Sequence, residues 1–387
     1  MTERSPGARE FAASSHRPLA IVRAEGAALF DDRGRRYVDL GATHGAGSLG
    51  PANPEVAEAI ARQAKDLLHI GSGYRSPVRT AFLEKLLGLL PSSFEKVFLS
   101  NSGTEAVEAA IKIARSATGR PKVVAAMRGF HGRTLGALSA TWRRELREPF
   151  EPLVPGFTHV PFNDAGALDA AVDPSTALIL LEPVQGEGGV HVATGEYLAA
   201  ARRAADGVGA LLAFDEVQTG IARTGRMFAF QHWNVVPDVL ILAKSLAGGF
   251  PIGATVTTAA VEGRFRGSHH STFGGNPLAC AAGLAALDFV EREHLAERAE
   301  RLGSAGIARL RGLPADRVRE VRGLGLLIGL ELRTKVAPYL AALEERGYLA
   351  IPAGATVLRL IPPLVISDAD WAAGLAAVEE VVTHGSG

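Results

Sequence analysis

The stretch VLILAKSLAGG at residues 239–249 decides the fold. Its first four residues form an apolar run of strand length. Lys244 lies two residues after this run and four residues before a pair of glycines. A continuous apolar run predicts a strand that is covered on both faces, because a half-exposed strand would alternate apolar and polar residues. A lysine just past such a strand lies at the edge of the sheet where α/β proteins bind their ligands.

Further apolar runs of the same kind alternate with helix-like stretches in the middle of the chain. Strands that alternate with helices predict an α/β fold with a mostly parallel sheet. The runs lie at Val97–Leu99, Val123–Ala126, Ala177–Leu181, Ala210–Phe214 and Gly253–Val256.

The two ends of the chain have a different character. Near the N-terminus, short strands around residues 27–30 and 37–40 predict a hairpin, and a helix is expected over 54–69. After about residue 285 we expect a smaller α+β domain. Its expected elements are a long charged helix through Glu291–Leu310, strands within Leu324–Leu332 and at Val357–Leu360, a helix near Pro338–Arg346 and a closing helix.

Composition excludes several classes of protein. The 387 residues include 41 Lys plus Arg and 41 Asp plus Glu, so the net charge gives no support for nucleic-acid binding. Cys280 is the single cysteine, which excludes an intrachain disulfide and a cysteine-based zinc site, and we expect no metal. No apolar run reaches the roughly 20 residues of a membrane helix, and no apolar signal core follows Met1, so a cytoplasmic location is expected.

Two other strand ends carry residues that fit a phosphorylated cofactor. Ser102, Gly103 and Thr104 follow an apolar run and precede an amphipathic helix, whose N-terminus suits a phosphate. Asp215 ends another run, where a carboxylate could keep a ring nitrogen protonated. Lys244, if desolvated, would have a lowered pKa and could form a Schiff base. Taken singly, each residue is equally typical of a helix cap, a surface acid or a strand-end lysine.

The combination is more specific than its parts. An aldehyde cofactor with a phosphate and a pyridine ring needs a Schiff-base lysine, an acid at the ring nitrogen and a phosphate cradle. All three occur here, each at a predicted strand end. The sequence therefore predicts a site for pyridoxal 5'-phosphate (PLP).

Several longer motifs in one order resemble the class III aminotransferases, which are PLP enzymes of fold type I. The motifs are SGTEA at 102–106, GFHGRT at 129–134, EPVQGEGG at 182–189, FDEVQTG at 214–220, AK at 243–244 and TFGGNP at 272–277. The resemblance spans roughly residues 18–385 and implies a large domain with a mostly parallel seven-stranded sheet. We expect an N-terminal segment (1–45) that packs with the small domain, a large PLP-binding domain (46–285) and a C-terminal small domain (286–387).

The resemblance implies a role for each matching residue around the cofactor. Ser102, Gly103 and Thr104 would hold the phosphate. Phe130 and Val217 would pack on the two faces of the ring. The remaining implied contacts are Asp215 at the ring nitrogen, Gln218 near the ring hydroxyl, Lys244 as the Schiff-base lysine, and Ser271 and Thr272 at the substrate and at the partner subunit's phosphate in a homodimer.

Two arginines are implied in substrate binding. Arg133 would bind the carboxylate of an ω-amino substrate, and Arg359 would clamp the α-carboxylate of glutamate or 2-oxoglutarate through its bidentate fork. Glu187 would neutralise Arg359 when the other substrate is bound. Without the resemblance, the sequence around Arg359 predicts a strand residue whose side chain faces outward.

Within the family, the chain most resembles acetylornithine aminotransferases of arginine biosynthesis and the lysine-biosynthesis enzymes whose substrate is carried by the protein LysW. The implied reaction moves the terminal amino group of N-acetylornithine or of LysW-γ-lysine to 2-oxoglutarate. Arg143 and Arg144 would then lie near the mouth of the site, facing an acidic carrier protein. Pro51 and the segment 71–74 depart from the family's pattern.

Three other functions remain open from the residues. An ornithine or 4-aminobutyrate aminotransferase would share the same site. A non-catalytic protein on the same fold would not need Lys244, Asp215 and Arg359 together. A dinucleotide-dependent oxidoreductase is suggested only by Gly45–Gly50, which spells GxGxxG but is followed by Pro51 where a helix should begin.

Overall fold

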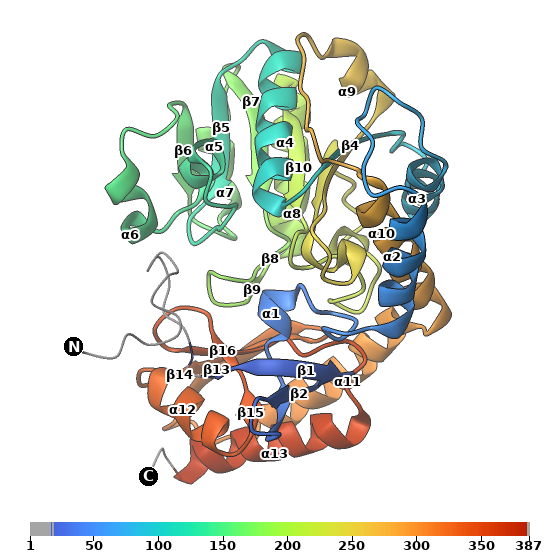
Figure 1. The fold of residues 1–387 in the computed structure, drawn as a ribbon. Coiled ribbons are helices and arrows are strands. Elements are labelled where there is room, and N and C mark those ends of the chain that lie inside the picture. Colours follow the sequence, from blue (N-terminus) through green and yellow to red (C-terminus); the bar gives the residue numbers. More distant parts are fainter. Residues whose placement is uncertain (1–16, 18, 385–387) are drawn as a thin grey trace, which may run out of the picture.

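A seven-stranded sheet forms the centre of the upper part of the molecule (Figure 1). The structure is a computed structural model that describes residue 17 and residues 19–384. Only β12 runs antiparallel to its neighbours, so the sheet is mostly parallel, as predicted. In spatial order the strands are β4 (Lys96–Ser100), β12 (Gly253–Thr257), β11 (Val239–Leu242), β10 (Leu211–Asp215), β7 (Thr176–Leu181), β5 (Lys122–Ala126) and β6 (Phe157–Val160).

Both faces of this sheet are buried, which explains the continuous apolar runs of its strands. In β10, Leu211 and Ala213 join one apolar cluster, whereas Leu212 and Phe214 join another on the opposite face. The first cluster includes side chains of α4 (Gly103–Thr118), α5 (Leu135–Ala140) and α9 (Ala259–Arg264). The second includes side chains of α3 (Pro77–Gly88), α7 (Ala165–Ala171), α8 (Gly195–Val208) and α10 (Pro277–Arg292).

A second, smaller sheet lies in the C-terminal part of the chain. Its strands, in spatial order, are β13 (Val318–Leu324), β14 (Leu327–Leu332), β17 (Val357–Leu360) and β16 (Ile351–Pro352). The neighbouring helices are α11 (Leu295–Leu310), α12 (Ala337–Glu345) and α13 (Asp368–His384). The prediction of one helix through Glu291–Leu310 was wrong, because α10 ends at Arg292 and His294 adopts a left-handed backbone with φ of 49°.

A third sheet joins the two ends of the chain. The predicted hairpin is formed by β2 (Ala28–Asp31) and β3 (Arg36–Asp39). It is extended by β1 (Ile21–Glu25), which pairs with β2. β15 (Tyr348–Leu349) adds to β3 in parallel, so N-terminal strands pair with a C-terminal strand. The domain limits at 45 and 285 stay predictions, and residues 1–16 and 18 of the N-terminal segment lie outside the described residues.

Short elements connect the sheets around the site. α2 (Pro54–Asp66) begins as predicted, since Asn53 caps the amides of Glu55 and Val56, but it ends three residues before the expected limit. The remaining elements are α1 (Ala42–Gly45), α6 (Arg144–Arg147), β8 (Val184–Gln185) and β9 (His191–Val192). Among the described residues, no helix combines the length and apolar character needed to cross a membrane.

A glycine contact holds α11 against the turn between β13 and β14. A Cβ atom at Gly303 would overlap the backbone of Gly325, which itself lies against the backbone of Thr224. The helix can therefore approach this turn only where a side chain is missing.

We predict that Gly303→Ala destabilises the protein by about 1–3 kcal/mol, the usual cost of overpacking. Gly207→Ala is the matched control, because Gly207 lies in α8 with nothing within 4 Å of the added Cβ. That variant should gain up to about 1 kcal/mol from helix propensity. Urea unfolding of both variants measures the difference, and equal stability of the two would contradict the packing at Gly303.

Candidate active site

A cavity of about 380 Å³ lies beyond the carboxyl ends of β10 and β11. Its size is within the ordinary range for small-molecule sites. Most of the predicted site residues line it, although they come from segments far apart in the sequence. The predicted residues in its wall are Ser102, Gly103, Thr104, Phe130, Arg133, Glu187, Asp215, Val217, Gln218 and Lys244.

The N-terminus of α4 supplies one wall of the cavity. Ser102 caps the helix, because its hydroxyl oxygen accepts from the amide of Glu105 at 3.4 Å. The first-turn amides of Gly103 and Thr104 have no acceptor within a helix, and they lie at its positive end. A Cβ at Gly103 would come within 2.9 Å of Val217 Cγ1, so glycine keeps this turn open. The arrangement can hold an anionic group such as a phosphate.

Asp215 is buried at the end of β10 and is fixed by two contacts. One carboxylate oxygen accepts from the amide of Val217 at 3.1 Å, and the other accepts from Nδ1 of His131 at 2.7 Å. Burial lowers the pKa of His131, but the hydrogen bond and charge of Asp215 outweigh it, so the pKa is raised overall. A carboxylate held in this way can stabilise a positive charge on a ligand in the cavity.

Glu182 is a second buried acid next to Asp215. Its carboxylate accepts from the amide of Phe130 at 2.9 Å, which fixes the backbone beneath the Phe130 ring. Burial raises the pKa of Glu182 to about 7, and the charge of Asp215 adds to this effect. The guanidinium carbon of Arg133 lies 5.9 Å from the centre of the Phe130 ring.

Lys244 begins a 3-10 turn directly after β11 and its side chain faces the cavity. Burial lowers the pKa of its amine, and the nearby charge of Arg359 lowers it further, although Glu187 and Asp215 act in the opposite direction. A neutral amine is a nucleophile and a general base. Its backbone φ of 45° is unusual for a lysine, and such strain is concentrated at functional sites.

Arg359 is fully buried on β17 and reaches the cavity through Glu187. Its Nη1 donates to Glu187 Oε1 at 2.7 Å and to Gln218 Oε1 at 2.9 Å. Burial raises the pKa of Glu187, but the close contact with His44 and the charge of Arg359 lower it more, so the pKa is lowered overall. The pair is therefore ionised, and either partner can exchange the other for a charged ligand.

Ser271 and Thr272 do not line this cavity. The hydroxyl of Ser271 accepts from Asn101 Nδ2 at 3.2 Å, just past the end of β4. Thr272 is exposed on the surface. Within one chain, Thr272 therefore lies apart from the residues that are predicted to hold the cofactor.

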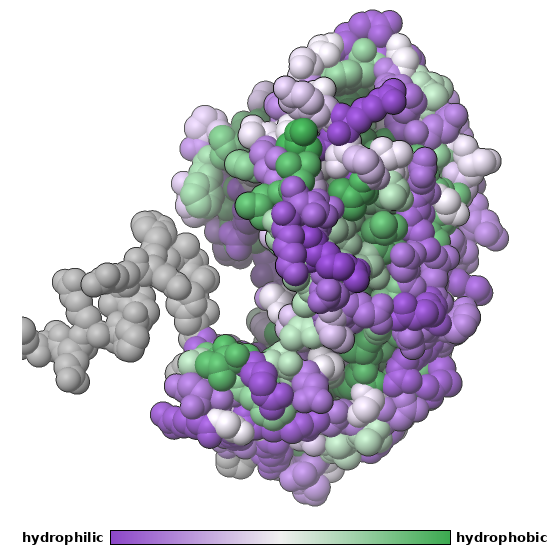
Figure 2. All heavy atoms as spheres, turned by 45° about the vertical axis from the view of Figure 1, so that its right-hand side comes forward, coloured by the Kyte–Doolittle hydropathy of each residue, from purple (hydrophilic) through white to green (hydrophobic). Residues whose placement is uncertain are grey.

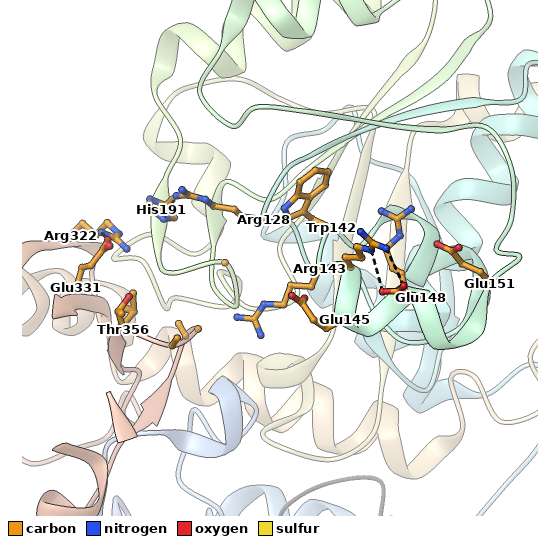
Figure 3. Close-up of a pocket in the computed structure, with 17 residues that line it drawn as sticks. Arg128, Trp142, Arg143, Glu145, Glu148, Glu151, His191, Arg322, Glu331 and Thr356 are labelled. Atoms are coloured by element: carbon orange, nitrogen blue, oxygen red, sulfur yellow. Dashed lines mark hydrogen bonds and ion pairs between the residues drawn. The ribbon is translucent and has the colours of Figure 1, made fainter. Parts of the chain in front are cut away.

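A larger cavity of about 780 Å³ lies beside the first, between α6 and the second sheet (Figure 3). Arg143 extends into it and donates to the backbone oxygen of Glu187 at 3.4 Å, which links the two cavities. Arg128 contacts His191 at 2.8 Å on the far wall. The basic side chains around this cavity are Arg128, Arg143, Arg144, Arg147 and Arg322.

Sequence reasoning missed several residues of the site. Glu182 follows the apolar run 177–181, so the strand-end rule that found Asp215 would also have found it. His131 stands inside the GFHGRT motif beside Phe130 and could have been assigned from it. His44 has no comparable signal. Among the described residues, no cluster of His, Cys, Asp and Glu could hold a metal ion.

The residues in the cavity fit PLP: a desolvated lysine, a buried acid and an open helix N-terminus surround one space. Fold and site together thus define a PLP-dependent enzyme of fold type I. The family model described as aminotransferase class-III matches residues 11–382, and the chain belongs to that family. It is a PLP-dependent transaminase.

Individual relatives agree with this assignment. The chain is 45% identical over 370 residues to the [LysW]-aminoadipate semialdehyde transaminase of Deinococcus radiodurans, covering 95% of this chain and 86% of that one. It is 45% identical to the acetylornithine aminotransferase of Methanopyrus kandleri, covering 94% of each chain. It also matches a structure of the ornithine aminotransferase from Toxoplasma gondii, described with PLP at partial occupancy, with a TM-score of 0.92, 35% identity and coverage of 97% and 92%.

We predict that Glu182→Gln makes the protein less sensitive to rising pH. The folded chain keeps a proton on Glu182 up to a pKa of about 7, whereas the ordinary pKa is 4.5. The folded state binds more protons between these values, so stability falls as pH rises from about 4.5 to 7. Glutamine can accept the same hydrogen bond without a charge.

The variant should therefore gain stability relative to the native protein across this range, by an amount on the order of 1–3 kcal/mol. Urea unfolding between pH 5 and pH 8 measures the difference. Parallel stability curves for the two proteins would show that burial does not hold the proton on Glu182.

Proposed function

We propose that the chain transfers the terminal amino group of N-acetylornithine, or of LysW-bound lysine, to 2-oxoglutarate. The observation that carries this proposal is the buried ion pair of Arg359 and Glu187 at 2.7 Å. A transaminase must bind an amino donor and a dicarboxylate acceptor in one cavity. A guanidinium that is paired with a movable carboxylate can serve both, because the acceptor's α-carboxylate can replace Glu187.

The two arginines divide the substrates between them in this proposal. Arg133 is exposed at the cavity wall and would bind the carboxylate of the donor, far from the amine that reacts. Arg359 would bind the α-carboxylate of 2-oxoglutarate after Glu187 has turned away. The donor's terminal amine has no adjacent carboxylate, so Glu187 would remain on Arg359 while the donor reacts.

The site residues would hold PLP as follows. The amides of Gly103 and Thr104 would bind its phosphate, and Phe130 and Val217 would enclose its ring. Asp215 would pair with the ring nitrogen, kept in place by His131 at 2.7 Å. Ser102 and Gln218 line the same wall and would complete the polar contacts, with Gln218 near the ring hydroxyl.

Lys244 would act both as the covalent anchor and as the proton carrier. When bound, PLP supplies an aldehyde that takes up the amino group and a ring that withdraws electrons from the carbon that loses its proton. The amine of Lys244 has a lowered pKa, so it could accept that proton and return it at the carbon that was the aldehyde carbon of the cofactor. Asp215 keeps the positive charge that the ring needs.

A donor panel tests the substrate assignment. With 2-oxoglutarate as acceptor, we expect kcat/KM for N-acetylornithine or LysW-bound lysine to exceed that for ornithine and for 4-aminobutyrate by more than tenfold. Lys244→Ala should abolish turnover and the visible absorbance of the covalently bound cofactor, a loss of several orders of magnitude in rate. Higher kcat/KM for ornithine or 4-aminobutyrate would refute the substrate proposal, and full activity of Lys244→Ala would refute the assigned lysine.

We propose further that the protein acts as a cytoplasmic homodimer with shared sites. Thr272 is exposed beside Phe273, which is 59% exposed and whose ring centre lies 5.0 Å from that of His69. Leu68 and Tyr74 are exposed in the neighbouring segment. Figure 2 turns this side of the molecule forward and shows apolar side chains exposed among hydrophilic ones. A second chain that covers them would bury apolar area and would bring Thr272 and Ser271 to its cofactor.

The larger cavity supports an acidic carrier protein as a source of the donor. Arg143 is exposed at the entrance and touches the backbone of Glu187, so a protein docked there would reach the active site. Arg144 is also exposed but already pairs with Glu148 at 3.1 Å. Arg143 is therefore the basic residue most available for a partner.

We expect Arg143→Glu to raise KM for LysW-bound lysine by roughly tenfold, through repulsion of an acidic partner, and to leave KM for N-acetylornithine unchanged. Arg62→Glu is the control, since Arg62 is also an exposed arginine, lies on α2 and lines neither cavity. Steady-state kinetics at low and high salt provide the measurement. Equal KM changes for both donors would argue against carrier docking at α6.

A further inference from the structure

The turn that follows β3 holds three successive residues in the left-handed region. Ala42, Thr43 and His44 have φ values of 39°, 50° and 58°. Such a conformation is strained for a residue other than glycine, so neighbouring contacts must impose it. Asp39 accepts hydrogen bonds from the amide of Ala42 at 2.7 Å and from that of Gly41 at 2.8 Å.

The turn places His44 against the ion pair of the active site. Its backbone oxygen accepts from Gln218 Nε2 at 3.0 Å. Its Nδ1 lies 3.1 Å from Arg359 Nη2 and 3.4 Å from Glu187 Oε1. The strained backbone therefore delivers one imidazole nitrogen to both members of the pair.

One nitrogen atom cannot satisfy both neighbours. A guanidinium only donates hydrogen bonds, so Nδ1 must be unprotonated to bond with Arg359. A carboxylate only accepts, so Nδ1 would need a proton to bond with Glu187. Of the two contacts, only the one with Arg359 has hydrogen-bond geometry, and in that hydrogen bond the imidazole nitrogen must be the acceptor.

We propose that His44 is a specificity-determining residue that competes with the acceptor's α-carboxylate for Arg359. The inference rests on the proposed function, in which Arg359 binds that carboxylate. In the resting site, Nη1 of Arg359 contacts Glu187 and Gln218, and Nη2 contacts His44 and the backbone oxygen of Pro352. A carboxylate that binds Arg359 through both nitrogens must displace the imidazole as well as Glu187.

This arrangement affects the two substrates differently. The donor uses Arg133 and leaves the Arg359 contacts intact, so His44 does not oppose its binding. The dicarboxylate acceptor has to break the contact with His44. The imidazole thus favours the donor over the acceptor for the same cavity, and it limits occupation of Arg359 by other carboxylates.

The test uses three variants of the PLP-bound enzyme. His44→Gly removes the ring and suits the positive φ at this position, so the turn should fold with less strain. His44→Asn keeps an oxygen acceptor near the position of Nδ1 and also tolerates this backbone. Thr43→Gly is the matched control, because it relaxes the same turn at an exposed residue outside the active-site cavity and leaves the imidazole in place.

Two measurements test the role of His44. Inhibition by glutarate, an unreactive dicarboxylate, reports binding at Arg359 and Arg133, and stopped-flow absorbance separates the donor and acceptor half-reactions. His44→Gly should lower the inhibition constant of glutarate and the apparent dissociation constant of 2-oxoglutarate by roughly three- to tenfold, which corresponds to one net hydrogen bond. The donor half-reaction should not change. His44→Asn and Thr43→Gly should both behave like the native enzyme.

Each other outcome overturns the proposal. Unchanged glutarate binding in His44→Gly would show that the imidazole does not compete for Arg359. Equal tightening in Thr43→Gly would show that relaxation of the turn, and not loss of the acceptor, is responsible. A failure of the proposed function is distinct, because the native enzyme itself would then not transfer amino groups to 2-oxoglutarate.

Discussion

Because both faces of the central strands of the large sheet are buried, a charged side chain can be placed there only at or beyond a strand end. The strands carry buried apolar residues to two separate clusters, one on each face. Asp215, Glu182 and Lys244 each follow directly on such a strand or end it. The constraint that makes the central strands apolar therefore also brings these three groups to one edge of the sheet.

Desolvation then sets the chemistry of those groups. It lowers the pKa of Lys244 and raises that of Glu182, because burial disfavours either charge. The charges that persist are paired: Asp215 with His131 and Arg359 with Glu187. Paired charges in a dry site are costly to leave alone, so a charged substrate group can enter only where it replaces one partner. In the proposed function, this requirement would let the Arg359 pair select among substrates.

The sequence alone could predict the site residues at the strand ends of the sheet, but not the residues that turns and distant contacts bring to the site. Apolar runs located the central strands and thus Lys244 and Asp215, while β6 at Phe157–Val160 was missed because it contains polar residues. His44 could not be predicted, since its position depends on a left-handed turn and on contacts with residues more than 100 positions away. The break at His294 likewise depends on one backbone conformation that apolar periodicity does not encode.

The central claim is that the amine of Lys244 carries the cofactor. Borohydride reduction of the PLP-bound enzyme, followed by peptide mass spectrometry, tests it most directly, because reduction makes the bond between a lysine and the cofactor permanent. The account predicts that the peptide containing Lys244 carries the cofactor and that all other lysines remain unmodified. A label on a different lysine, or none at all, would contradict it.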